Sequence, residues 1–203
     1  MPCRALIRLE RRIGGVRAGS ASFIHSLGPV GQRLLADDAP RRRRQEPSLT
    51  FLNHTRAVAE LIVQLVEASR VDRLALLDYQ TEPTCWRRYL GPHGNREVLK
   101  LDLRLTIGTV ALEHHWFVEI DLGTEHRPAV LRKCRQYAAY YHSGQEQRRA
   151  GIFPKVAWLC TMTDRAYRLA TAIAADVKLP HELFAVQPMA AALDRLSGQE
   201  IRR

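Results

Sequence analysis

Residues 99–107, Leu-Lys-Leu-Asp-Leu-Arg-Leu-Thr-Ile, decide the fold class of this chain. Apolar and polar side chains alternate without a break, and a period of two is the repeat of a β-strand with one buried face. Gly108 ends this run. A second strand pattern covers residues 115–122 and places Glu119 and Asp121 together on its polar face. The two patterns predict neighbouring strands whose polar faces carry acidic side chains.

Helical and strand patterns alternate on both sides of this pair. Residues 53–69 carry apolar side chains at helical spacing, and Asn53 or Thr50 is the expected N-cap. Further helices are predicted at 128–142, 164–177 and 189–196, and further strands at 73–79, 156–160 and 183–186. We therefore expect an α/β domain with a mixed sheet of about five strands flanked by helices.

No apolar stretch approaches the roughly 18 residues that a membrane-spanning helix requires, and no secretory signal precedes the domain. We therefore expect a cytoplasmic protein without membrane contacts.

The N-terminal 47 residues differ from the rest in composition. Residues 4–27 form a hairpin pattern, and a short helix pattern begins at Pro29. A basic hairpin beside a short helix is typical of the wing of a winged helix, although the chain starts where the preceding helices would be. The hairpin is therefore either part of a shortened winged helix or a packing element. A polar linker ends at Pro47, so we expect a partial winged-helix segment with its linker at 1–47 and an α/β domain at 48–203.

Charge points to a phosphate-bearing partner. The formal net charge is +10, and residues 1–50 hold 10 Lys+Arg against 4 Asp+Glu, which is +6 of that total. Such a surface attracts nucleic-acid backbones, and arginine favours bidentate phosphate contacts. The expected DNA contacts are the arginines of the hairpin and linker: Arg8, Arg11, Arg12, Arg17, Arg41, Arg42, Arg43 and Arg44.

The paired strands place three carboxylates where they could converge. Asp102 lies on the first strand, and Glu119 and Asp121 lie on the second. Carboxylate oxygens are the ligands that Mg²⁺ prefers, and a bound metal can activate water against a phosphodiester. Lys133 follows on the next predicted helix, where Tyr137 can share its face. These residues predict a catalytic set of Asp102, Glu119, Asp121 and Lys133, with Mg²⁺ held by the three carboxylates. The four cysteines show no CxxC pair or zinc spacing, which favours free thiols.

Three stretches carry a resemblance to a known family. They are residues 26–35 (SLGPVGQRLL), residues 54–60 (HTRAVAE) and residues 117–125 (FVEIDLGTE), the last followed by Lys133 and by 137–141 (YAAYY). In this order they resemble the replication-relaxation family, proteins associated with plasmid replication. The element order also resembles the PD-(D/E)XK nuclease-like fold. The resemblance implies a winged-helix DNA-binding segment followed by a nuclease-like domain.

The sequence departs from the nuclease pattern at two points. Leu101, rather than proline, precedes Asp102, and Asp121 stands where the pattern places a lysine. Lys133 would have to replace that lysine from the helix. Three hypotheses remain: a DNA-binding protein in plasmid replication or its control, a Mg²⁺-dependent DNA endonuclease, and a protein-interaction scaffold on a nuclease-like fold. Replication proteins or a second copy of the chain would be the protein partners.

Overall fold

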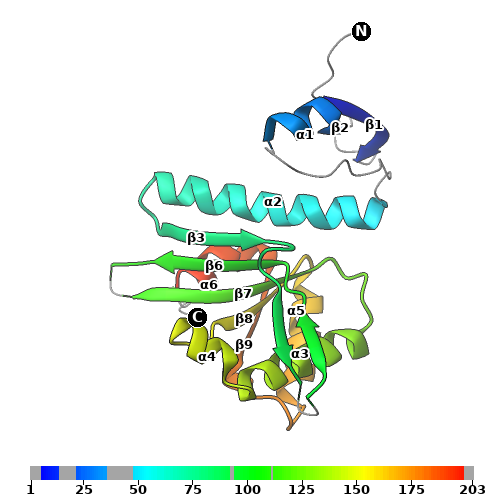
Figure 1. Cartoon of the computed structure of the whole chain (residues 1–203). Helices are drawn as coiled ribbons and strands as arrows, with labels where there is room; N and C mark the ends of the chain where they lie inside the picture. The colour runs from blue at the N-terminus through cyan, green and yellow to red at the C-terminus, as the bar shows by residue number, and fades with distance from the viewer. Residues whose placement is uncertain (1–5, 14–21, 36–47, 92–93, 111, 199–203) are drawn as a thin grey trace. The chain divides into compact units, whose positions relative to one another are not determined.

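The structure, a computed structural model, describes residues 6–13, 22–35, 48–91, 94–110 and 112–198. The chain divides into two compact units, residues 1–51 and residues 52–203. Each unit is described by itself below, with the element labels of Figure 1.

The first unit contains an antiparallel hairpin and a short helix. Strands β1 (Leu6–Ile13) and β2 (Ser22–Leu27) pair with Leu6 opposite Leu27, and the register shifts between Leu9 and Arg12. Helix α1 (Pro29–Leu35) follows directly. The hairpin and the helix starting at Pro29 are therefore confirmed, whereas the winged-helix assignment stays a prediction.

A five-stranded mixed sheet organises the second unit. Its strand order is β3-β6-β7-β8-β9. The β3–β6 and β6–β7 pairs are antiparallel, and the β7–β8 and β8–β9 pairs are parallel. The strands are β3 (Ala75–Thr81), β6 (Leu103–Gly108), β7 (Glu113–Asp121), β8 (Lys155–Cys160) and β9 (Phe184–Pro188). The expectation of a mixed sheet of about five strands flanked by helices is confirmed, with most strand ends shifted by one or two residues.

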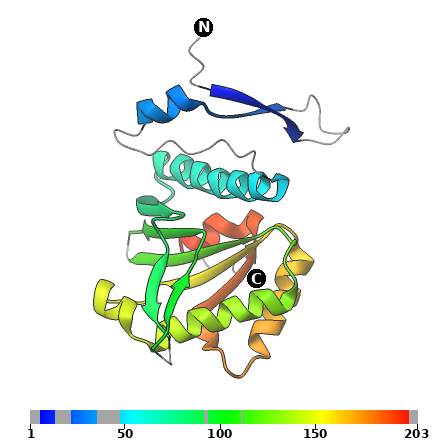
Figure 2. The same cartoon turned by 45° about the vertical axis from the view of Figure 1, so that its right-hand side comes forward.

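Helices cover both faces of this sheet, as Figures 1 and 2 show. On one face, α2 (Leu49–Arg70) and α6 (Ala192–Leu196) bury a core with the leucines of β6. On the other face, α3 (Arg127–His142) and α5 (Thr163–Ala174) bury a second core with Phe117 of β7 and Trp158 of β8. The remaining helical elements of this unit are helix α4 (Gln145–Ala150) and two 3-10 turns, His181–Leu183 and Met189–Ala191.

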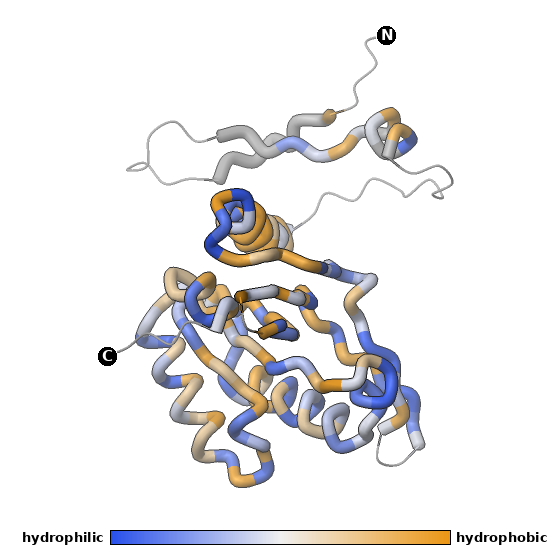
Figure 3. The backbone as a smooth tube through the Cα atoms, turned by 90° about the vertical axis from the view of Figure 1, so that its left-hand side faces the viewer, coloured by the Kyte–Doolittle hydropathy of each residue, from blue (hydrophilic) through white to orange (hydrophobic). Residues whose placement is uncertain are grey.

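Helix α2 starts four residues before its expected beginning. The hydroxyl of Ser48 accepts a hydrogen bond from the backbone N–H of Phe51 at 3.2 Å, so the capping prediction of Asn53 or Thr50 is wrong. Leu61, Leu65 and Ala68 are its buried residues. Figure 3, which looks nearly along α2, shows hydrophobic and hydrophilic residues on different sides of the helix. Among the described residues, none of the helices is long and apolar enough to cross a membrane.

The alternating run at 99–107 is not one strand. It is divided between β5 (Arg96–Leu99), which pairs with β4 (Arg87–Leu90) in a separate hairpin, and β6 of the main sheet. Leu99 and Leu101 belong to the α3 side of the core, whereas the leucines of β6 face α2. The apolar alternation continues across the break because the apolar residues of both segments are fully buried, although in two different cores. Periodicity alone could therefore not reveal the change of direction.

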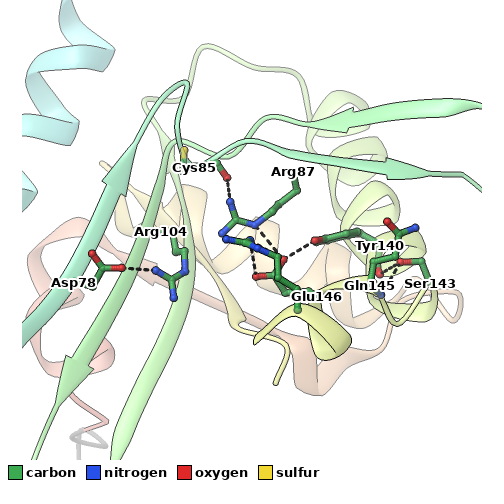
Figure 4. Close-up of polar contacts among 9 residues, drawn as sticks. Asp78, Cys85, Arg87, Arg104, Tyr140, Ser143, Gln145 and Glu146 are labelled. Atoms are coloured by element: carbon green, nitrogen blue, oxygen red, sulfur yellow. Dashed lines mark hydrogen bonds and ion pairs between the residues drawn. The ribbon is translucent and has the colours of Figure 1, made fainter. Parts of the chain in front are cut away.

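A buried ion pair joins the β4–β5 hairpin to helix α4. The Arg87 Nε donates to Glu146 Oε2 at 3.0 Å, and both side chains are 5% exposed or less. Arg87 also donates to the Cys85 carbonyl at 2.6 Å, and the Tyr140 hydroxyl donates to Glu146. Figure 4 shows this network. It fixes the hairpin against α3 and α4, two elements that are far apart from it in sequence.

Candidate functional site

Asp102 lies in the turn that leads into β6, where its carboxylate is buried. One oxygen, Oδ2, accepts the backbone N–H of Ile120 at 2.7 Å and so joins the start of β6 to the end of β7. The other, Oδ1, lies 3.3 Å from Nε2 of His54 on α2. The hydrogen bond to Asp102 raises the pKa of His54 above its ordinary value, against the opposing effect of burial. Asp102 therefore connects the start of β6 to His54 on helix α2.

Glu119 lies near the end of β7 with its side chain 2% exposed. Its Oε2 is 2.5 Å from Nζ of Lys133, and its Oε1 accepts the hydroxyl of Tyr137 at 2.5 Å. Lys133 and Tyr137 are four residues apart on α3 and therefore lie on the same side of the helix. The expectation that these two residues share a helix face is confirmed.

Burial dominates the titration of Glu119. Removal from water raises the pKa of Glu119 to about 8, and the nearby charge of Asp102 acts in the same direction. The contacts with Lys133 and Tyr137 act against this shift but do not cancel it. A carboxyl with a pKa near neutrality can exchange a proton in the physiological range, which is the property required of a general acid or base.

Asp121 has a different set of partners. Its Oδ2 accepts from Nε of Arg165 on α5 at 2.7 Å, and its Oδ1 accepts the backbone N–H of Gly123 at the same distance. Arg165 also donates to the carbonyl of Glu125 at 2.6 Å. Asp121 thus fixes the loop between β7 and α3 and positions an arginine from α5.

The structure therefore groups the expected site residues in two sets. Asp102, Glu119 and Lys133 form one electrostatically connected cluster, together with His54. Asp121 lies two residues from Glu119 on the same strand face but is paired with Arg165. Neither His54 nor Arg165 was among the site residues expected from the sequence. His54 opens one of the stretches that carry the family resemblance, and that position was the available signal.

The carboxylates as arranged do not fit Mg²⁺. Every oxygen of Asp102, Glu119 and Asp121 already has a donor, and three of those donors are His54, Lys133 and Arg165. Basic side chains at these distances oppose a divalent cation. Within the described ranges, no group of three or more His, Cys, Asp or Glu side chains is placed to hold a metal ion.

Two pockets open beside the N-terminal half of α3. The first, here called the Lys133 pocket, has a volume of about 430 Å³ and is lined by Glu125, Ala129, Arg132, Lys133 and Gln136. The second, the α3–α5 pocket, has a volume of about 410 Å³ and is lined by His126, Arg127, Pro128, Arg165, Arg168 and Leu169. The Lys133 pocket gives solvent access to the amine that contacts Glu119.

The expected DNA-contacting arginines lie in the first unit. Arg8, Arg11 and Arg12 fall within β1, where the strand is described but their side chains are not. Arg17 and the run Arg41–Arg44 lie outside the described residues. Their contacts with DNA stay predictions.

Part of the chain matches a known protein family. The model of a family described as replication-relaxation matches residues 3–156, about three quarters of the chain. The chain belongs to the replication-relaxation family. The match includes His54, Asp102, Glu119 and Lys133, so the whole connected cluster lies within the replication-relaxation region, whereas Arg165 lies beyond its end. No curated protein and no solved structure matches the chain, and the likeness to the PD-(D/E)XK fold therefore stays a prediction.

Proposed function

We propose that this replication-relaxation family member binds DNA and acts in plasmid replication or its control. The observation that carries the proposal is a formal net charge of +10 in a chain of this family. Basic surfaces of this kind attract the phosphate backbone of nucleic acids regardless of base sequence.

The distribution of ion pairs supports this proposal. Each buried carboxyl group has a basic partner inside the fold: Asp102 contacts His54, Glu119 contacts Lys133, Asp121 contacts Arg165 and Glu146 contacts Arg87. Among the described residues, several exposed arginines have no carboxylate partner: Arg56, Arg70, Arg127, Arg132 and Arg168. The positive charge is therefore presented to solvent, where it can meet phosphates.

We expect binding to DNA that weakens steeply with salt. A fluorescein-labelled duplex titrated with the protein, followed by fluorescence anisotropy, should show affinity falling linearly on a double-logarithmic plot between about 50 and 200 mM NaCl. The slope reports the number of phosphates contacted, at roughly 0.9 for each. Replacing Arg41, Arg42, Arg43 and Arg44 by glutamine should reduce the slope if the linker contacts DNA. Absence of binding at about 50 mM salt would contradict the proposal.

A DNA endonuclease is the second candidate function, and one contact favours it. The amine of Lys133 reaches Glu119 from α3, so a lysine does stand beside the acidic residue although it does not come from the strand itself. Asp102 and Glu119 would hold Mg²⁺ only after His54 and Lys133 gave up their contacts.

A further inference from the structure

The α3–α5 pocket lies at the edge of the sheet where the parallel strands β7 and β8 end and their following helices begin. Helix α3 follows β7, helix α5 follows β8, and these two strands are parallel neighbours. Loops and helix starts that follow neighbouring parallel strands meet at the carboxyl edge of the sheet, which is where open α/β sheets bind their ligands. The pocket takes residues from both: His126 and Arg127 from the start of α3, and Arg165 and Arg168 from α5.

The lining of this pocket is strongly basic. Three guanidinium groups and one imidazole face a volume of about 410 Å³. Arg127 and Arg168 are exposed, and neither has a carboxylate partner among the residues that the structure describes. Like charges gathered at one opening repel each other unless an anion joins them. Pro128 and Leu169 supply an apolar wall, which strengthens the attraction between the arginines and an anion.

Arg165 is already oriented in this pocket by the protein. Its Nε donates to Asp121 at 2.7 Å and its Nη2 to the Glu125 carbonyl at 2.6 Å. The buried Asp121 therefore holds the guanidinium of Arg165 in place, while Arg127 and Arg168 are exposed to solvent. An oriented guanidinium loses little freedom on binding, and the guanidinium fork matches the geometry of a phosphate.

We propose that the α3–α5 pocket seats a phosphate of the nucleic-acid backbone, with Arg127, Arg165 and Arg168 as its ligands. The inference rests on the proposed DNA binding and adds the place of contact. The exposure of Arg127 and Arg168 favours a phosphate within a polymer over a small enclosed ligand. Arg127 lies within the residues that the family match covers, whereas Arg165 and Arg168 lie beyond its end.

The test is the double variant Arg127→Ala/Arg168→Ala, titrated into labelled double-stranded DNA at several salt concentrations. Loss of two of the three arginines that hold this phosphate should weaken binding on the order of tenfold at about 0.1 M salt and reduce the salt slope by about 1. Replacing both arginines by lysine keeps the charge but not the fork, and should restore most of the slope and only part of the affinity.

The matched control is Arg96→Ala/Arg148→Ala, which removes the same charge from two exposed arginines on β5 and α4. The salt slope of this control should differ from the wild-type slope by less than about 0.5. If the wild-type protein binds DNA and both double variants bind equally well, the pocket inference is overturned while the proposed function stands. If the wild-type protein binds no DNA, both are overturned. Equal urea midpoints of the variants would exclude unfolding as the cause.

Discussion

Replacing Glu146 by glutamine is expected to lower the free energy of unfolding by about 3–5 kcal/mol, the usual effect of removing one partner of a buried ion pair. Arg87 is 5% exposed and would keep its charge without a counterion. The amide could still accept a hydrogen bond, but it could not neutralise the guanidinium. Urea denaturation followed by circular dichroism would measure the change.

The control is Asp78→Asn, which makes the same chemical change in a second arginine pair drawn in Figure 4. Asp78 accepts from Arg104 at 2.5 Å, but its side chain is 50% exposed. Exposed pairs contribute about 0–1 kcal/mol, because water screens the attraction. Equal losses in the two variants would show that burial of the Arg87–Glu146 pair is not what makes it strong.

The stability of the protein is expected to fall as the pH rises from about 4.5 to about 8, and Glu119 is the reason. Its pKa in the folded state is about 8, above the value of 4.5 that it has in the unfolded chain. The folded state therefore binds the proton more tightly, and this stabilisation is complete below pH 4.5 and lost as the pH passes 8. A tenfold change in proton affinity is worth about 1.4 kcal/mol, so we expect a loss of a few kcal/mol.

Two substitutions separate Glu119 from other groups. Glu119→Gln should remove most of this fall, because glutamine does not titrate. Lys133→Met should extend the fall to higher pH, because the amine that opposes the shift is lost. His54 has a raised pKa and contributes in the same direction, so His54→Gln should remove only a smaller part. An unchanged pH profile in Glu119→Gln, measured by urea titration at each pH, would refute the assignment.

The hydrophobic pattern of the sequence correctly predicted those helices and strands that have a clear apolar face or apolar run. Helices α2, α3 and α5 and strands β7 and β8 were expected within a few residues, because a period of 3.6 or a short apolar run marks them. The β4–β5 hairpin was missed. Its strands have only four residues each, and the sequence Arg-Arg-Tyr-Leu of β4 gives no hydrophobic signal. The burial of Arg87 depends on Glu146, which lies 59 residues later.

The candidate site was predicted only in part, because some of its contacts are local in sequence and others are not. Glu119 and Lys133 were expected together, because a strand and the helix that follows it are local in sequence. Neither the contact of His54 with Asp102 nor that of Arg165 with Asp121 could be deduced, because each joins residues more than 40 positions apart. Such contacts depend on how the elements pack, and periodicity carries no information about that packing.

Incubation of the purified protein with supercoiled plasmid, with and without Mg²⁺ or Mn²⁺, tests the central claim most directly. The Glu119→Gln variant serves as the control, and agarose electrophoresis gives both readouts. We expect the plasmid to be retarded at low salt and to stay supercoiled with either metal, equally for both proteins. A plasmid that migrates unretarded would contradict DNA binding, and metal-dependent nicking that disappears in the variant would identify the protein as an endonuclease instead.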